Sequence, residues 1–493
     1  MFSFIRNFFF RNNSASQTVI KNTVWLLGGE VLGRIIRFSL VIYAARILGT
    51  AEYGVFSYAL SIAALLTLLA DFGIAPVLTR EASKNVSERS KYFATAFLIK
   101  LQLVLIIILA TIFLLPQITR LDSISVLIPL IILVFVFDSF REFGFGMNRA
   151  LEKMELEALI KVFLNLAVVG LGFWVLFTLP TAYNLLIAYV LGTGLAFLAT
   201  AFILRSYLFS LFRFVDFSLM GHIVKTAIPI GFLQVLGALM LNTDMVMLGW
   251  WEVESQIGLY SGANKIILLL YVLPNLIAAS AFPAFSRLAK TDKEQFRDIF
   301  EKVLATTFLL SLPLVVGGFL TAPALIHFLY GAQYADSVPV LLILLPTILI
   351  VFPSTILANA LFAHNEQRKF LWFVALGVLS NIALNIVFIP RWGISGVALA
   401  TLGSVLLTNV FIWQATKKVV SFALFRYIYK ALIASLIMGL GVWFFGIYLS
   451  LPFLLMLLIA IVLYIVSLIL LKDSLLQSLI GIFQGRVGNK KIS

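Results

Sequence analysis

The feature that most constrains this chain is a succession of apolar segments, each long enough to cross a lipid bilayer. A spanning helix needs about 20 mostly apolar residues, and its backbone groups must be satisfied internally in lipid. Segments of this kind lie near residues 20–46, 54–79, 92–115, 124–146, 160–179, 183–205, 226–250, 257–282, 303–322, 338–362, 370–389, 395–416, 428–449 and 452–471. The sequence therefore predicts an all-α integral membrane protein with about fourteen transmembrane helices.

Composition agrees with a lipid environment. Hydrophobic residues make up 62% of the chain and charged residues 12%. In soluble domains, apolar residues average about 45–50% and charged residues about 25%. It has no cysteine and only three scattered histidines, so disulfides and thiolate sites are excluded and a histidine-built metal site is not expected. No cofactor is predicted, although a coupling proton or sodium ion stays open.

The net charge of +14 could indicate nucleic-acid binding, but the basic residues lie almost wholly between the apolar segments. There they indicate orientation, because cytoplasmic connectors carry an excess of Lys and Arg. The basic connectors are 79–91, 147–161, 206–225, 283–302, 363–369 and 417–427. This alternation predicts a multi-pass protein of the plasma (inner) membrane with both termini cytoplasmic, and no nucleic-acid partner.

An internal repeat predicts two lobes. Residues 53–57 (YGVFS) align with residues 257–261 (IGLYS) at an offset of 204, so the first helix pair resembles the seventh and eighth helices. Pro76, Arg80 and Ala82 likewise align with Pro283, Arg287 and Ala289 at an offset of 207. An even number of helices separates the copies, so the lobes are expected to be parallel and related about the membrane normal.

The repeat divides the chain into six predicted parts. The two lobes contain six helices each, and the final helix pair falls outside the repeat. The predicted parts are a cytoplasmic interfacial N-terminus at 1–19, an N-lobe at 20–205, a cytoplasmic linker at 206–225, a C-lobe at 226–416, the helix pair at 417–471 and a cytoplasmic tail at 472–493.

One N-terminal block resembles a known family. Its motifs are the residues 45–49 (ARILG), 52–54 (EYG), 71–73 (DFG) and 80–81 (RE). In order and spacing they resemble the polysaccharide transporter family, which includes the Wzx-type O-antigen flippases and shares a superfamily with the lipid II flippase and the MATE exporters. The resemblance implies a MATE-like fold of two six-helix lobes plus a helix pair. It also implies a substrate, oligosaccharide linked through pyrophosphate to a polyprenol, moved from the inner to the outer leaflet for surface polysaccharide biosynthesis.

The first predicted helix carries the strongest candidate for a binding site. Glu30, Arg34 and Arg37 follow at i, i+4 and i+7, which places them on one face, and Gly33 beside them would admit a headgroup or another helix. Ionisable residues within spans are costly and usually face a cavity or a partner. Because the planar guanidinium binds phosphate oxygens in pairs, we expect Arg34 and Arg37 to hold the pyrophosphate. The alternative is a self-neutralising Glu30–Arg34 pair.

Two further residues complete the predicted site. The resemblance implies cavity cations on the first and eighth helices, which makes Lys265 a third candidate ligand; the alternative is a lysine that extends to the outer headgroups. Asp244, on the seventh helix, and Glu30 are candidates for coupling or gating, as a salt bridge or as a site for a coupling ion. A purely structural pair is the alternative for Asp244.

The remaining intramembrane charges favour structural roles. Asp138, Arg141 and Glu142 have the i, i+3, i+4 spacing of side chains that pair with one another. Lys100 is predicted to extend toward the headgroups, and Asp71 to pair with a neighbouring helix or with Arg80. Whether the acids at Asp71, Asp138 and Glu142 also serve function is left open.

The predicted function is a flippase for lipid-linked oligosaccharide that works by alternating access and is not an enzyme. Its expected partners are the polyprenyl-pyrophosphate-linked glycan, membrane lipid and other polysaccharide-assembly proteins. A MATE-type exporter of small molecules should have an acid-dominated cavity, whereas this one is expected to be cationic. A membrane glycosyltransferase or ligase should carry a large outer loop, and the outer loops here are short. A non-transporting scaffold is disfavoured by the charges within the spans.

Overall fold

The computed structural model describes residues 15–449, 451–473 and 475–477, and every regular element in these ranges is a helix. Within the described residues, twelve helical stretches are long and apolar enough to cross a membrane. The predicted all-α membrane fold is therefore confirmed. The helices are α2 (Ala15–Asp71), α3 (Ile74–Lys84), α4 (Arg89–Ile118), α5 (Asp122–Ala150), α6 (Met154–Thr178), α7 (Ala182–Ile203), α8 (Arg205–Phe209), α9 (Phe217–Trp251), α10 (Glu254–Leu270), α11 (Val272–Thr291), α12 (Lys293–Tyr330), α13 (Ser337–Leu344), α14 (Pro346–Ala363), α15 (Gln367–Val419), α16 (Phe425–Leu449) and α17 (Phe453–Leu470), with single 3₁₀ turns at Val86–Glu88, Leu211–Arg213 and Ala332–Tyr334.

The two longest elements each contain a non-helical glycine near their middle. Helix α2 has 57 residues and is broken at Gly49 (φ 75, ψ 179), and α15 has 53 residues and is broken at Gly393 (φ 54, ψ −132). A continuous helix of that size would be about 80–86 Å long, far more than one bilayer crossing. Each therefore supplies two spans, which agrees with the predicted count of about fourteen. Glycine occupies both breaks because a positive φ strains residues that carry a Cβ.

The chain divides into two compact units, Met1–Ser261 (unit 1) and Gly262–Ser493 (unit 2). The predicted lobe boundaries at 206–225 and 417–471 stay predictions. Of the predicted N-terminal segment 1–19 only residues 15–19 are described, and of the tail only 472, 473 and 475–477. The rest of both segments lies outside the described residues.

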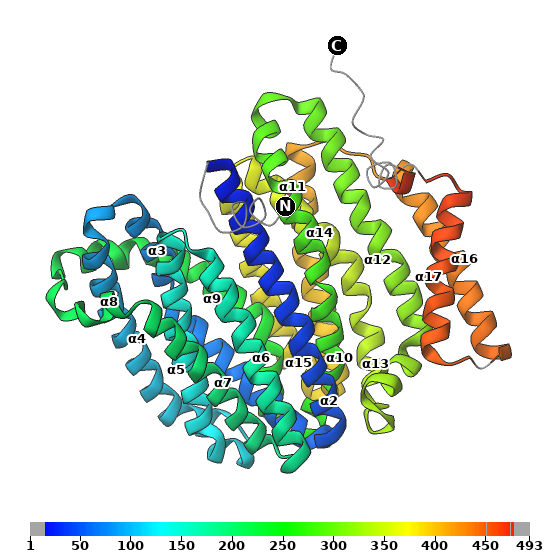
Figure 1. Cartoon of the computed structure of the whole chain (residues 1–493). Coiled ribbons are helices and arrows are strands. Elements are labelled where there is room, and N and C mark those ends of the chain that lie inside the picture. The colour runs from blue at the N-terminus through cyan, green and yellow to red at the C-terminus, as the bar shows by residue number, and fades with distance from the viewer. Residues whose placement is uncertain (1–14, 450, 474, 478–493) are drawn as a thin grey trace, which may run out of the picture. The chain divides into compact units, whose positions relative to one another are not determined.

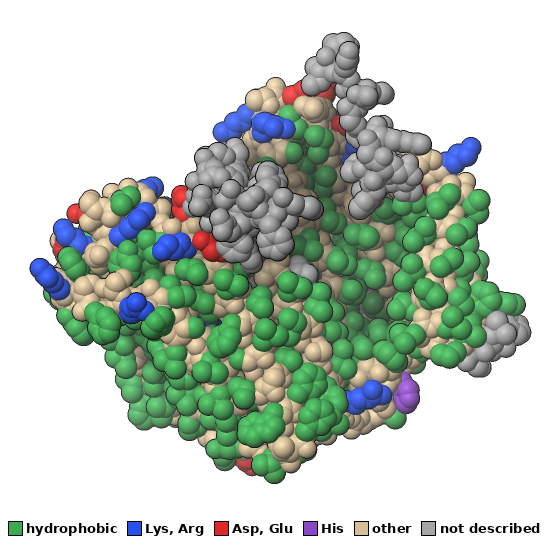
Figure 2. Space-filling model, in the orientation of Figure 1, with side chains coloured by type: hydrophobic (Ala, Val, Ile, Leu, Met, Phe, Trp, Pro, Cys, Tyr) green, Lys and Arg blue, Asp and Glu red, His purple; other side chains and the backbone are tan. Residues whose placement is uncertain are grey.

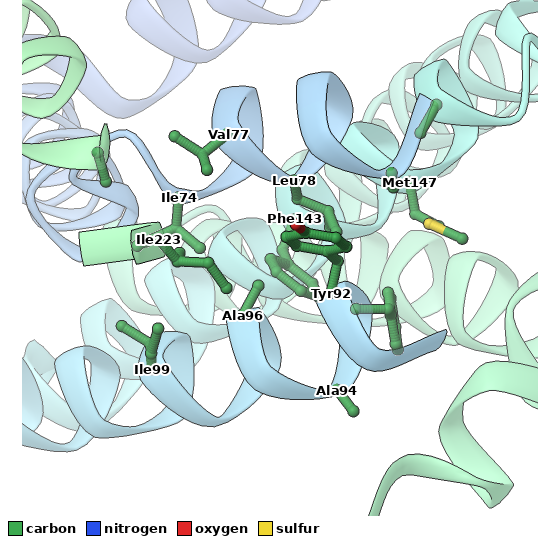
Figure 3. Packing of buried hydrophobic residues seen from close by; sticks show 14 of the residues in the cluster. Ile74, Val77, Leu78, Tyr92, Ala94, Ala96, Ile99, Phe143, Met147 and Ile223 are labelled. Carbon is green, nitrogen blue, oxygen red and sulfur yellow. The ribbon is translucent and has the colours of Figure 1, made fainter. Parts of the chain in front are cut away.

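Unit 1 contains α2 to α9, which run beside one another in Figure 1, and the start of α10. One of its core clusters gathers around α3, α4 and α5, where Leu78, Tyr92 and Phe143 lie close together (Figure 3). Ala227 and Ile223 add α9 to this cluster. Apolar side chains from α3, α4, α5 and α9 therefore share one core, and α5 also contributes to the polar pocket described below.

The repeat-related glycines lie against each other inside unit 1. A Cβ on Gly54 would overlap the backbone oxygen of Glu254, and a Cβ on Gly258 would overlap that of Thr50. Tyr53 and Tyr260, beside these glycines, are fully buried. The repeat thus marks a place where α2 and α10 approach backbone to backbone, which only residues without a side chain permit.

Unit 2 has its own core. Phe285 on α11 packs with Phe296 and Phe300 on α12, and all three are buried. The C-terminal pair, α16 and α17, packs against α12 through smaller clusters, and Tyr464 Oη donates a hydrogen bond to the Leu309 carbonyl oxygen at 2.6 Å. The helix pair is therefore an integral part of unit 2.

Candidate functional site

A polar pocket of about 340 Å³ lies among α2, α5 and α6 of unit 1. It contains both arginines that the sequence analysis selected on the first helix. Its lining residues are Gly29, Gly33, Arg34, Arg37, Asp138, Arg141, Glu142, Lys161, Leu164 and Asn165. Four of these side chains are cationic and two are acidic, so the lining that the structure describes carries an excess of two positive charges.

Two glycines on α2 line this pocket and lie against α6. A Cβ on Gly29 would contact Ala158 at 3.2 Å, and a Cβ on Gly33 would overlap the side-chain amide of Asn165. Both contacts are with α6, so the glycines at i and i+4 allow the two helices to approach closely. Of the two predicted uses of Gly33, the structure shows the approach of another helix.

Arg37 is held by neutral groups. Its Nε donates a hydrogen bond to Asn165 Oδ1 at 2.9 Å, and its guanidinium carbon lies 5.8 Å from the centre of the Tyr189 ring. The Asn165 amide nitrogen in turn donates to the Lys161 carbonyl oxygen at 2.7 Å, which fixes the orientation of the amide. No carboxylate in the described part of the chain forms an ion pair with Arg37, so no acid contacts its guanidinium directly.

Two other cations of the pocket, Arg141 and Lys161, form ion pairs with acids. Arg141 contacts Asp138 and, at 3.0 Å, Glu142, which confirms the local pairing predicted from their spacing. Lys161 Nζ lies 3.1 Å from Glu157 Oε1, and Glu157 also accepts two hydrogen bonds from Arg149 at 2.6 and 2.7 Å. Arg141 is therefore a counter-charge held within α5, whereas Lys161 shares its acid with another cation.

One expectation is wrong. Lys100, predicted to extend toward the headgroups, is fully buried and pairs with Asp71 at 3.3 Å. Asp71 ends α2, where Phe72 and Gly73 have positive φ (38 and 82), and its Oδ1 also accepts a hydrogen bond from the Ala75 backbone at 3.3 Å. Because unpaired charge is costly inside the protein, the lysine contacts the acid at this helix break rather than reaching water. The alternative in which Asp71 pairs with a neighbouring helix is confirmed.

Of the remaining predicted site residues, Lys265 and Asp244 are not among the described residues that line the pocket. Lys265 lies on α10 in unit 2 and is half-buried. Asp244 lies on α9 in unit 1, is buried, and accepts a hydrogen bond from Tyr260 Oη at 2.7 Å. The side chain of Glu30 lies outside the described residues, although its backbone is part of α2. The roles proposed for these three residues stay predictions.

Among the pocket residues that were not selected from the sequence as ligands are three with hydrogen-bond donors, Arg141, Lys161 and Asn165. Arg141 was assigned only to local pairing. Lys161 and Asn165 stand at i and i+4 on α6, and Gly29 and Gly33 stand at the same spacing on α2. Two small residues four positions apart on one helix allow another helix to approach closely. Together with the polar pair at the same spacing on α6, they could have suggested that α2 contacts α6.

Comparison with known proteins places the chain in a family. Residues 19–289 match the family model described as polysaccharide biosynthesis protein, which is more than half of the chain, and residues 229–387 match the MatE model. The chain belongs to the polysaccharide biosynthesis protein family. The family resemblance stated from the N-terminal motifs is therefore confirmed.

Individual relatives agree with this family. A protein of Haloferax volcanii named probable flippase AglR is 32% identical over 181 residues, which cover 36% of this chain and 38% of the relative. The probable low-salt glycan biosynthesis flippase Agl15 of the same organism is 21% identical over 77% of this chain and 80% of its own length. The capsular polysaccharide biosynthesis protein CapF of Staphylococcus aureus is 19% identical over 77% of this chain and 95% of its own length.

Solved structures share the fold. The lipid II flippase MurJ in an inward closed conformation superimposes with a TM-score of 0.71 at 19% identity, over 92% of this chain and 99% of MurJ. A multidrug resistance MATE family transporter in an inward-facing conformation gives a TM-score of 0.56 at 15% identity, over 78% of this chain and 98% of its own. At these identities the likeness supports the fold, and the MATE-like architecture expected from the sequence is confirmed.

Proposed function

We propose that this protein is a flippase that moves polyprenyl-pyrophosphate-linked oligosaccharide from the inner to the outer leaflet of the plasma membrane. The proposal rests on family membership, on relatives named as flippases of glycan biosynthesis, and on the charge of the pocket in unit 1. It describes a transporter rather than an enzyme.

The observation that carries the proposal is that Arg37 lines the pocket and is held by neutral groups. Its guanidinium is oriented by a neutral amide and an aromatic ring, so it keeps its positive charge while its position is fixed. A pyrophosphate offers several anionic oxygens that could accept from the remaining guanidinium nitrogens in a forked arrangement. Arg34 lines the same pocket, one turn away on α2. The two arginines would hold the headgroup while the prenyl chain stays in lipid.

The direction of transport follows from the charge of the headgroup. An inside-negative membrane potential favours moving negative charge outward by about 2.3 kcal/mol per charge per 100 mV. Alternating access would expose the pocket first to the cytoplasm, where we place both termini, and then to the outside. A coupling proton or sodium ion could add to this driving force through Glu30 or Asp244.

The test is transport in proteoliposomes. A polyprenyl-pyrophosphate-linked disaccharide with a nitrobenzoxadiazole label is bleached by external dithionite only when the label faces outward. We expect the parent protein to expose the inner-leaflet pool, and Arg34→Ala and Arg37→Ala to lose most of this activity. Arg120→Ala is the matched control, because Arg120 is exposed in the same unit and does not line the pocket.

The same vesicles separate the alternatives. Normal transport in both pocket variants would contradict the role of the two arginines. Export of a cationic dye by the parent protein, without movement of the labelled lipid, would favour a MATE-type exporter instead.

A further inference from the structure

The connector between α7 and α9, residues 204–216, exposes aromatic side chains to an unusual degree. Phe209 and Phe212 are 90% and 91% exposed, more than any other large hydrophobic side chain in the described ranges. Around them lie four further exposed aromatic and basic side chains, Phe202, Arg205, Arg213 and Phe217. We call these six residues together the aromatic–basic face. Exposed apolar groups that cluster in this way mark an interaction site, whereas single exposed residues do not.

The connector is held firmly on its other side. Leu204 and Leu211 are only 3% and 5% exposed and belong to the core cluster of unit 1. Asp216 donates its backbone N–H to Thr95 Oγ1 at 3.0 Å, which ties the end of the connector to α4. The connector that carries the aromatic–basic face is therefore packed against the core on its other side, and the face is exposed although the segment itself is anchored.

The position of the connector in the chain places it at a membrane surface. It joins α7 and α9, both long and apolar enough to span. Helix α7 has 22 residues and a length of about 33 Å, close to the hydrocarbon thickness of a bilayer. The chain that follows Ile203 therefore begins at the level of the lipid headgroups.

The charge of this region is complementary to an anionic surface. Figure 2 shows Lys and Arg side chains gathered at the end of unit 1 where α3 and α8 lie, above a flank covered by hydrophobic side chains. The Arg205 guanidinium lies 4.4 Å from the centre of the Phe202 ring, so a basic and an aromatic group of the face act side by side. Segments that combine aromatic and basic residues in this way bind at the boundary between headgroups and acyl chains.

We propose that the aromatic–basic face is a binding site for anionic phospholipids. Arg205 and Arg213 contact the phosphate-bearing headgroups, and Phe209 and Phe212 insert beneath them. The face anchors the connector to the leaflet and concentrates anionic lipid beside unit 1. A soluble protein partner is a less suitable occupant, because the spans on either side keep the face at the bilayer surface.

The chain contains no cysteine, so a single introduced cysteine can be labelled specifically. Ser210→Cys, between the two exposed phenylalanines, receives a nitrobenzoxadiazole fluorophore. Thr178→Cys, beside the exposed Phe177 at the end of α6, provides the control. The full-length protein is placed in nanodiscs that contain spin-labelled phosphatidylglycerol or spin-labelled phosphatidylcholine at equal mole fraction, and quenching by the two lipids is compared.

At position 210 we expect clear preference for phosphatidylglycerol, with about fivefold enrichment for each arginine that contacts it. At position 178 we expect equal quenching by the two lipids. Arg205→Gln with Arg213→Gln should remove the preference while quenching by both lipids persists. Phe209→Ser with Phe212→Ser should reduce quenching by both lipids, because the label moves toward water.

Equal quenching by the two lipids at position 210 in the parent protein would overturn the proposal. So would the absence of quenching by either lipid, which would place the face in water or under a protein partner. The measurement needs no transported substrate, so its outcome is independent of the proposed flippase function.

Discussion

Lys100 and Arg37 are both cations within the spans of unit 1, yet the protein holds them in opposite ways. Lys100 is fully buried and contacts the carboxylate of Asp71 at 3.3 Å. Arg37 borders a pocket and is oriented by the amide of Asn165 and the ring of Tyr189. A buried cation paired with an acid has its charge satisfied within the fold. A cation held by neutral groups keeps its charge for a ligand, and on this ground we propose that the charge of Lys100 is structural and that of Arg37 functional.

The largest expected effect comes from breaking the structural pair. Lys100→Met leaves Asp71 buried without its partner, which should lower the free energy of unfolding by about 3–5 kcal/mol. Thermal unfolding of the purified protein in nanodiscs measures this change. The matched control is Lys302→Met, because Lys302 pairs with Asp298 at 2.6 Å while half-exposed, and such pairs contribute only about 0–1 kcal/mol.

Adding Asp71→Leu to Lys100→Met should restore much of the lost stability, since no unpaired charge then remains. A Lys100→Met protein as stable as the parent would show that the pair is not structural.

The reverse pattern is expected for the functional charge. Arg37→Gln removes a charge that contacts no acid, so the unfolding temperature should stay close to that of the parent. The initial rate of lipid-linked disaccharide transport should fall about 10- to 100-fold, the value of a lost charge-assisted hydrogen bond. The proteoliposome assay and thermal unfolding measure the two quantities on one preparation. Loss of stability without loss of transport would contradict the assignment.

The close approach of α2 and α6 can be tested by adding one methyl group. Gly33→Ala places a Cβ against the amide of Asn165, and such overpacking costs about 1–3 kcal/mol. It should also displace the acceptor of Arg37 and slow transport. Gly28→Ala is the matched control, because a Cβ there meets nothing within 4 Å. Equal unfolding temperatures for the two variants would mean that the helices do not pack as described.

The smallest effect is expected from replacing Asn165, whose amide oxygen accepts the hydrogen bond of Arg37, by an acid. Asn165→Asp puts a carboxylate where the amide oxygen lies 2.9 Å from Arg37 Nε, and we expect transport to fall about fivefold. The defect should shrink as the pH is lowered, because protonation of the new carboxyl removes its negative charge. Asn165→Gln should retain more activity at neutral pH. A pH-independent defect would indicate a change of shape rather than of charge.

The sequence predicted the helices and the local charge pairs well, for physical reasons. Apolar segments of bilayer length are unambiguous because a segment that crosses lipid must satisfy its own backbone hydrogen bonds, which a helix does. The break at Gly49 separates the predicted spans 20–46 and 54–79, and the break at Gly393 separates the predicted spans 370–389 and 395–416. The Asp138–Arg141–Glu142 cluster was predictable because residues three and four apart on a helix face each other.

Contacts between distant parts of the chain could not be predicted in this way. Lys100 meets Asp71, 29 positions away, and Arg37 meets Asn165, 128 positions away. Helical periodicity gives the face of each residue but not the helix that covers it, so Lys100 was misassigned and Asn165 was missed. Arg34 and Arg37 were found because two arginines on one face of a span need an explanation in any arrangement.

The most direct test of the central claim is a binding measurement. The affinity of the protein in nanodiscs for a polyprenyl-pyrophosphate-linked disaccharide is compared between the parent, Arg37→Gln and the exposed control Arg120→Gln. The account predicts that Kd rises at least about tenfold in Arg37→Gln and stays unchanged in Arg120→Gln. The same Kd in the parent and in Arg37→Gln would contradict the claim that Arg37, which forms no ion pair with an acid, binds the anionic headgroup.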